Sequence, residues 1–240
     1  MDNRSARGKF ITFEGLDGCG KTTQLEKLAT VLRAEGIEVL TTREPGGTEI
    51  GERIRTVLLD SRTAGLDPMA EMALMFASRA QQIAQVIMPS LENGRWVLCD
   101  RFTDSTEAYQ GGGRQLGSDA VLQLHKVLCR GLWPDLTILM DSDVDHSVKR
   151  ARRRNKMAVD GALPDENRFE QESYAFFTRV HEAFLAIAKR EPQRVALVDA
   201  RRPADIVHPE IVAIVQERLM RLKKESTSHA TGRAEREANL

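Results

Sequence analysis

Residues 15–22 have the types and the spacing of a loop that binds phosphate. The segment reads GLDGCGKT, which fits the pattern G-x-x-x-x-G-K-[ST]. Its glycines let the backbone turn so that several N–H groups point at phosphate oxygens, and the following helix N-terminus adds positive potential. Lys21 would reach the β- and γ-phosphates of a nucleoside triphosphate, and the Thr22 hydroxyl would ligate Mg²⁺. The expected triphosphate-binding residues are Gly15, Leu16, Asp17, Gly18, Cys19, Gly20, Lys21, Thr22 and Thr23. A flexible glycine turn without a ligand is the alternative interpretation.

A second polar segment, residues 100–114, follows the third expected strand and reads DRFTDSTEAYQGGGR. Its first two residues put a carboxylate and a guanidinium beside the phosphate loop. Arg101 can hold a second phosphate through two parallel hydrogen bonds, and Asp100 can hold Mg²⁺ through its water shell. A structural ion pair at the end of a strand is the alternative.

Two further groups of side chains suit a nucleobase and a polyphosphate. Phe76 and Arg79 are three residues apart on an expected helix, so they share a face that offers a ring and a planar donor. A plain core role for Phe76 is the alternative.

A cluster of cations at a helix end would stabilise charge on a transferring phosphoryl group. This cluster consists of Arg150, Arg152, Arg153 and Arg154. A solvated surface cluster without a ligand is the alternative.

Five short β-type runs alternate with helical patterns, which is typical of βαβ units around a parallel sheet. The expected strands are Phe10–Phe13, Glu38–Thr41, Trp96–Cys99, Leu136–Met140 and Val195–Val198. The expected helices are Thr23–Ala34, Glu71–Ser90, Asp119–Cys129, Asp145–Arg154, Gln171–Lys189 and Pro203–Leu222. Ligands gather at the carboxyl ends of such strands, where both polar segments fall. We predict an α/β fold of three layers, with helices on both faces of a five-stranded parallel sheet.

Length and composition exclude several classes of protein. The chain has 240 residues, which suits one domain, and 35 basic residues balance 35 acidic ones, which argues against a general nucleic-acid or membrane binder. No apolar run approaches the roughly 20 residues that cross a membrane. Three cysteines without metal spacing suit a reducing cytoplasm. We expect a polar tail at 1–9, one domain at 10–222 with a lid at about 150–168, and a disordered tail at 223–240.

Taken together, these segments resemble those of the bacterial thymidylate kinase family. The shared pieces, in the family's order, are FEGLDGCGKTTQ, TREPGGT, LMFASRAQ, DRFTDSTEAYQGGGR, VKRARRR and NRFEQES. The resemblance implies the P-loop fold of nucleoside monophosphate kinases, with a short lid. It also implies transfer of the γ-phosphoryl group of ATP to dTMP with Mg²⁺, and a homodimer.

The resemblance further implies roles for single residues. The dTMP-binding residues would be Asp17, Arg43, Phe76, Arg79, Arg101, Ser105, Tyr109 and Gln110. Among them the ring of Phe76 would stack on thymine, Arg79 would bond its O4, and Arg101 would hold the dTMP phosphate. The catalytic residues would be Lys21, Arg101, Arg150, Arg154 and Asp17, and the Mg²⁺ ligands would be Thr22 and Asp100. The adenine pocket would involve lid arginines and the backbone of Ala200–Pro203.

Two features depart from the family pattern and concern the lid. Asn167 stands where an aspartate is common before the matching Arg168, and the stretch 155–166 is longer than a compact lid.

Two other functions fit part of the pattern. A small kinase for a different acceptor would share the P-loop, but Arg101 favours an acceptor that already bears phosphate. A P-loop switch that hydrolyses nucleotide slowly would give the acceptor-side residues no purpose.

Overall fold

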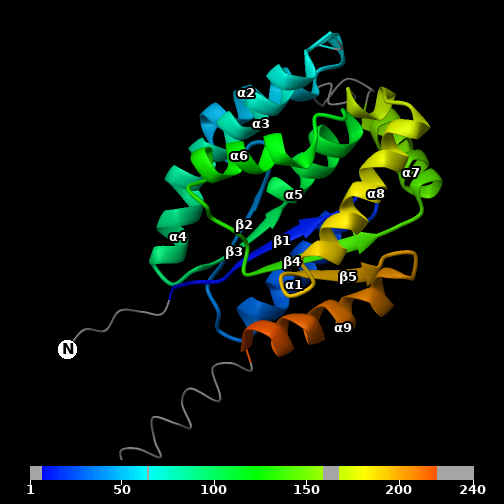
Figure 1. The fold of residues 1–240 in the computed structure, drawn as a ribbon. Helices are drawn as coiled ribbons and strands as arrows, with labels where there is room; N and C mark the ends of the chain where they lie inside the picture. The colour runs from blue at the N-terminus through cyan, green and yellow to red at the C-terminus, as the bar shows by residue number, and fades with distance from the viewer. Residues whose placement is uncertain (1–6, 64, 159–167, 221–240) are drawn as a thin grey trace, which may run out of the picture.

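A five-stranded parallel sheet forms the centre of the structure, a computed structural model that describes residues 7–63, 65–158 and 168–220 (Figure 1). The strands are β1 (Phe10–Glu14), β2 (Val39–Arg43), β3 (Trp96–Asp100), β4 (Leu136–Asp141) and β5 (Val195–Asp199). Their order in the sheet is β2-β3-β1-β4-β5, and every neighbouring pair is parallel. The predicted fold class is therefore confirmed, with strand ends that differ from the expected ones by at most two residues.

Helices cover both faces of this sheet (Figure 1). They are α1 (Lys21–Ala34), α2 (Glu49–Leu59), α3 (Pro68–Gln82), α4 (Met88–Glu92), α5 (Thr103–Thr106), α6 (Ser118–Leu128), α7 (Val144–Ala158), α8 (Tyr174–Arg190) and α9 (Ala204–Val215). Short 3₁₀ and π-helical segments are η1 (Ser61–Thr63), η2 (Ile83–Ile87), η3 (Glu107–Gly113), η4 (Phe169–Gln171) and η5 (Gln216–Met220). One core packs α1 and α9 against the sheet, and two further clusters fill the opposite face under α3, η3 and α8.

Helix α3 differs at both ends from the expected helix Glu71–Ser90. It begins at Pro68 because the carboxylate of Asp67 caps it, accepting from the N–H groups of Met69 at 2.8 Å and Ala70 at 3.3 Å. It ends at Gln82, where the backbone continues as the π-helical segment η2.

Helix α2 and the segment α5–η3 were not predicted. The latter carries polar residues and three glycines, which are typical of a loop. In the structure two of these glycines lie under α8: a Cβ on Gly112 would approach Ala183 Cβ to 2.7 Å, and one on Gly113 would approach the Phe176 ring to 2.6 Å.

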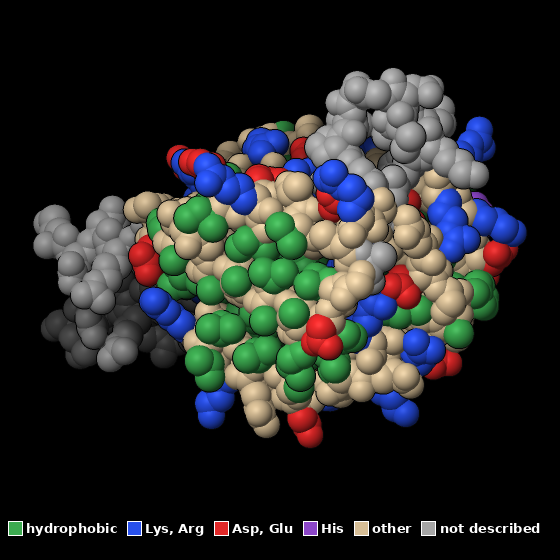
Figure 2. Space-filling view, turned by 90° about the horizontal axis from the view of Figure 1, so that it is seen from above, with side chains coloured by type: hydrophobic (Ala, Val, Ile, Leu, Met, Phe, Trp, Pro, Cys, Tyr) green, Lys and Arg blue, Asp and Glu red, His purple; other side chains and the backbone are tan. Residues whose placement is uncertain are grey.

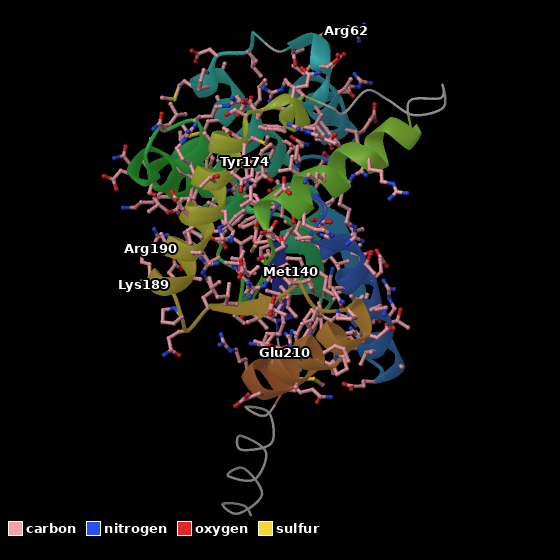
Figure 3. The ribbon with its side chains drawn as sticks, turned by 90° about the vertical axis from the view of Figure 1, so that its right-hand side faces the viewer. Arg62, Met140, Tyr174, Lys189, Arg190 and Glu210 are labelled. Atoms are coloured by element: carbon pink, nitrogen blue, oxygen red, sulfur yellow. The ribbon has the colours of Figure 1, made fainter. Side chains whose placement is uncertain are left out.

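The sheet order brings the two polar segments together. Strand β1 lies between β3 and β4, in a register that pairs Phe13 with Asp100 and Glu14 with Leu139. The loop after Glu14 therefore lies beside the residues that follow β3. Figure 3 looks onto this carboxyl edge, with Met140 near its centre and Glu210 of α9 at one end.

The predicted tail at 223–240, residues 1–6 of the predicted N-terminal tail and the lid residues 159–167 lie outside the described residues, as do the side chains of 154–158. In the part of the chain that the structure describes, no helix has the length and apolar character needed to cross a membrane.

Candidate active site

The loop between β1 and α1 has the tight backbone that a phosphate cradle requires. Gly15 has φ +131°, and a Cβ there would lie 2.6 Å from the carbonyl oxygen of Met140. Gly18 has φ +85°, and a Cβ there would lie 2.5 Å from the carbonyl oxygen of Ser147. Both positions therefore need glycine, for backbone conformation and for the close approach of β4 and α7.

Two side chains at the start of α1 point toward this loop and the end of β3. Lys21 is 5% exposed, and its Nζ donates to the carbonyl oxygens of Leu16 at 2.9 Å and Gly15 at 3.2 Å. Thr22 Oγ1 donates to Asp100 Oδ2 at 2.6 Å. A hydroxyl and a carboxylate oxygen side by side form the kind of donor set that Mg²⁺ prefers, so these residues fit that ion.

Arg101 has a strained backbone conformation beside the loop. Its φ is +75°, in the left-handed region that side chains other than glycine rarely adopt. The flanking peptides are held by hydrogen bonds: Arg101 N–H donates to Phe13 O at 3.0 Å, and Phe102 N–H donates to Glu14 Oε1 at 2.7 Å. The guanidinium donates to Gly15 O at 3.1 Å and to Ser105 Oγ at 2.8 Å.

Asp17 completes this cluster from within the loop. It accepts a hydrogen bond from Arg101 at 2.6 Å and one from the Tyr109 hydroxyl at 3.1 Å, and its carboxylate lies 4.0 Å from Lys21 Nζ. Burial alone would raise the pKa of Asp17, but Arg101 and Lys21 outweigh it and hold that pKa well below its usual range. The loop therefore carries a fixed negative charge between two cations.

A buried arginine on α3 faces the segment after β3. Arg79 Nε donates to Glu44 at 2.5 Å, both side chains being 2% exposed, and its Nη2 donates to Thr106 Oγ1 at 2.9 Å. Burial raises the pKa of Glu44 to about 7, although Arg79 opposes the shift. Arg79 Nη1 is buried and has no hydrogen-bond partner among the described residues. An unused buried donor favours a ligand at this place.

Phe76 lies in the core rather than on an open surface. Its ring is 0% exposed in the cluster with Phe10 and Phe102, and the Arg79 guanidinium covers it at 4.8 Å. Met75, four residues before Arg79 rather than three, lies instead in the cluster that contains Tyr109. Stacking of a base on Phe76 stays a prediction.

The remaining residues predicted to bind the acceptor lie near Arg101 or farther out. Ser105 and Tyr109 contact Arg101, and Gln110 Nε2 donates to Glu71 Oε1 at 2.7 Å. Arg43 lies farther out, where its half-exposed side chain pairs with Glu52 of α2 at 3.1 Å.

The lid arginines are only partly described. Arg150 is exposed and lines a pocket between the P-loop and α9, together with Cys19, Gly20, Thr23, Gln24, Met140, Ala200, Arg202, Ala204 and Val207. The side chain of Arg154 lies outside the described residues. Arg168 is 3% exposed and points away from this pocket, since its Nη1 donates to Glu71 at 2.6 Å.

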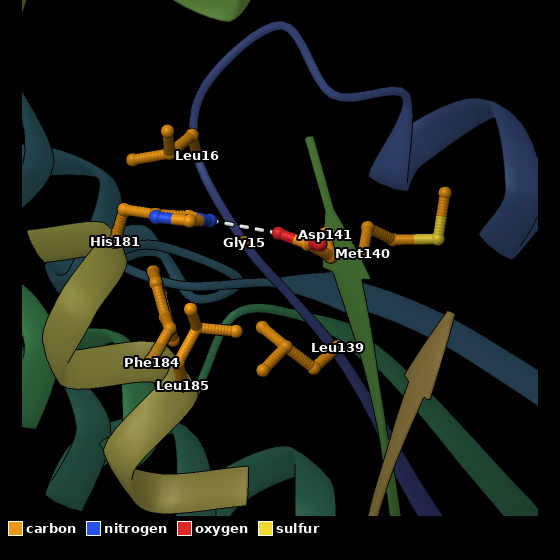
Figure 4. A pocket seen from close by; sticks show the side chains of 8 residues that line it. All are labelled: Gly15, Leu16, Leu139, Met140, Asp141, His181, Phe184 and Leu185. Carbon is orange, nitrogen blue, oxygen red and sulfur yellow. Dashed lines mark hydrogen bonds and ion pairs between the residues drawn. The ribbon is translucent and has the colours of Figure 1, made fainter. Parts of the chain in front are cut away.

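A second small pocket lies between the P-loop and α8 (Figure 4). His181 Nε2 and Asp141 Oδ1 are 2.7 Å apart across it.

Sequence reasoning missed two glutamates that hold the site together. Glu14 accepts from Phe102 N–H and Ser105 Oγ, and Glu71 binds Gln110, Arg114 and Arg168. Both carboxylates are fully buried. Their positions could have indicated this role: Glu14 lies in a largely apolar strand, and Glu71 lies on the apolar stripe of a helix.

Comparisons with known proteins agree with this geometry. A family model described as thymidylate kinase matches residues 13–211. The chain is 46% identical to a thymidylate kinase of Pelobacter propionicus over 93% of this chain and 99% of that protein. It is 48% identical to one of Pseudomonas fluorescens over 90% of this chain and 99% of that protein.

A solved structure also shows similarity to thymidylate kinases. The crystal structure of thymidylate kinase from Ehrlichia chaffeensis superimposes with a TM-score of 0.68 at 33% identity, over 88% of this chain and 99% of that one. The chain therefore belongs to the thymidylate kinase family, and the reaction it catalyses is the ATP-dependent phosphorylation of dTMP.

Proposed function

We propose that the enzyme holds ATP on residues 15–23 and dTMP between α3 and η3, so that the two phosphate groups meet beside Arg101. The observation that carries this proposal is the position of the Arg101 guanidinium, 2.6 Å from Asp17 and 3.1 Å from the Gly15 carbonyl. A guanidinium next to a phosphate loop supplies the second phosphate site that a monophosphate acceptor needs.

The reaction is an in-line transfer between two bound nucleotides. The loop N–H groups, Lys21 and Arg101 place positive charge where negative charge develops on the transferring group. No covalent nucleophile is required, and burial raises the pKa of the Cys19 thiol, which keeps it unreactive.

Thr22 and Asp100 would hold Mg²⁺, since their oxygens lie 2.6 Å apart at the end of β3. The bound ion neutralises charge on the ATP phosphates.

The pocket lined by Arg150 and Arg202 is our candidate for the adenine site. It lies next to Thr23 and the backbone of Ala200, as the family resemblance implies. Gln24 Oε1 is buried there without a partner among the described residues, which leaves one acceptor for an exocyclic amine. Arg150 and Arg154 would act on the phosphates from the lid.

The apolar outer face of α3 and α6 supports a homodimer. Met69, Ala73 and Ala77 form an exposed stripe on α3, and Val127 and Leu128 are exposed on α6. Figure 2 shows hydrophobic side chains gathered on this face of the molecule. Patches of this kind mark interaction sites.

We also infer that the enzyme works in the cytoplasm, where its unpaired cysteines stay reduced.

A coupled ADP-release assay with two variants tests the placement of the nucleotides. Lys21→Ala should lower kcat by more than about tenfold, because a charge that stabilises the transition state is lost. Arg101→Ala should raise the KM for dTMP by about tenfold or more and leave the KM for ATP nearly unchanged, because its contact is to the acceptor phosphate.

Arg95→Ala is the matched control, since this half-exposed arginine also pairs with a carboxylate, Glu38, but away from the site. It should behave as wild type. If Arg101→Ala folds and leaves the KM for dTMP unchanged, the acceptor phosphate does not bind there.

A further inference from the structure

Glu71 is a fully buried carboxylate at the inner face of α3, and three side chains converge on it. Oε1 accepts from Gln110 Nε2 at 2.7 Å and from Arg114 Nε at 3.2 Å. Oε2 accepts from Arg114 Nη2 at 3.1 Å and from Arg168 Nη1 at 2.6 Å. A buried carboxylate with two guanidinium partners is compensated in charge, so it can stay in this position.

These contacts determine which way the Gln110 amide faces. Arginine only donates hydrogen bonds, so each oxygen of Glu71 already accepts from at least one cation and offers no proton in return. Gln110 must therefore present its NH₂ group to Glu71, and its Oε1 is left on the other side. In the described part of the chain, the hydrogen bond of the Gln110 amide is the one from Nε2 to Glu71, and Oε1 accepts none.

A second unpartnered polar atom belongs to α3. Arg79 Nη1, on the same face of α3 as Glu71, is a buried donor without a partner in the described part of the chain. Arg79 also donates to Thr106, the last residue of α5, which runs directly into η3 four residues before Gln110. Helix α3 thus carries one unused donor, and η3, which packs near it, carries one unused acceptor.

This pair matches the edge of one pyrimidine and mismatches the other. Thymine presents the O4 acceptor next to the N3–H donor, whereas cytosine presents an N4 amino donor next to an N3 acceptor. We propose that Glu71 is a positioning residue for acceptor specificity: it takes the N–H of Gln110 and so turns the amide oxygen toward N3–H of the base. This inference rests on the proposed place of dTMP between α3 and η3.

The test measures the dissociation constants of dTMP and dCMP by calorimetry for wild type, Glu71→Gln, Gln110→Ala and the double variant. Glu71→Gln can offer NH₂ to Gln110, so the Gln110 amide is free to turn. We expect the preference for dTMP over dCMP to fall by about tenfold or more in each single variant. On the Gln110→Ala background, Glu71→Gln should change the ratio by less than about twofold, because it acts through the deleted side chain.

Glu172→Gln is the matched control, since Glu172 pairs with the same Arg114 at 2.5 Å but has no contact with Gln110 in the described residues. It should keep the wild-type ratio. A folded Glu71→Gln variant that binds dTMP and dCMP more weakly by the same factor would overturn the proposal. A wild-type ratio of the two dissociation constants in Gln110→Ala would also overturn it, and this result is informative even if Glu71→Gln does not fold. An unchanged dTMP affinity in Arg101→Ala would instead overturn the placement of the nucleotides.

Discussion

Arg101 is held in a conformation that its own backbone disfavours. A left-handed φ in a residue other than glycine costs about 1–3 kcal/mol and persists only where the surroundings impose it. Here the imposing groups are Phe13 O and Glu14, and the result is a guanidinium aimed at Asp17. The strain is therefore part of how the Arg101 side chain is positioned at the proposed acceptor phosphate site.

His125 supports the same segment and makes the stability depend on pH. Its Nδ1 lies 2.8 Å from Thr103 Oγ1, and its ring packs at 3.9 Å on Trp133. Burial, with Arg79 adding to it, lowers the pKa of His125 to about 4. The unfolded chain binds this proton more readily. The contribution of neutral His125 to stability is therefore fully present above pH 6.5 and is lost as the pH falls toward 4. The loss should be on the order of 2 kcal/mol.

Urea unfolding at pH 7.5 and pH 4.5 measures this loss. His125→Gln should lose about 2 kcal/mol less than wild type between the two values, because its amide takes up no proton. His146→Gln, an exposed position on α7, should keep the wild-type dependence. Equal losses in wild type and His125→Gln would show that His125 does not titrate as a buried group.

At the scale of residues, the backbone of the predicted phosphate loop follows from local rules, whereas the surroundings of the predicted base-site residues depend on packing. The loop depends on local rules, because Gly15 and Gly18 need conformations that only glycine adopts easily. Phe76 and Met75 both lie at helical spacing from Arg79, and only the packing of α3 on the sheet decides that Phe76 joins the core. The roles of Glu14 and Glu71 depend on partners far away in the sequence.

At the scale of elements, the π-helical segment η3 depends on its glycines. A Cβ on Gly113 would lie 2.6 Å from the Phe176 ring and 2.8 Å from Val180, both on α8. Gly113→Ala should therefore lower the free energy of unfolding by about 1–3 kcal/mol through overpacking. It should also raise the KM for dTMP, because η3 carries Tyr109 and Gln110.

Urea unfolding and steady-state kinetics measure the two effects. Gly65→Ala is the control: no described atom lies within 4 Å of its added Cβ, so its stability should stay within about 0.5 kcal/mol of wild type. A Gly113→Ala variant as stable as this control would contradict the role given to close packing.

The same segment explains why some elements escape prediction from sequence. The strands were found because buried parallel strands are continuous apolar runs, such as Phe10–Phe13. In contrast, 107–113 reads as a loop, and only its packing under α8 makes it helical. Tertiary packing overrides local propensity at that point.

At the scale of the whole molecule, α3 links the proposed acceptor site to an outer apolar face. Its inner side carries Glu71 and Arg79, and its outer side carries the exposed stripe of Met69, Ala73 and Ala77. An exposed apolar stripe on a helix whose other side is already buried is typical of a surface that is covered by a partner. We infer that a second copy of the chain covers the outer side in solution.

Val127 is the best position to test this, because it is 72% exposed on α6 beside the α3 stripe. Val127→Glu should convert the dimer to a monomer in sedimentation velocity, since a buried unpaired charge is costly at an interface. Ile206→Glu on α9, 57% exposed on the other side of the sheet, should leave the dimer intact. Because α3 carries the acceptor side chains, the monomer should also bind dTMP more weakly. A dimer that survives Val127→Glu would mean that the two copies meet through another face.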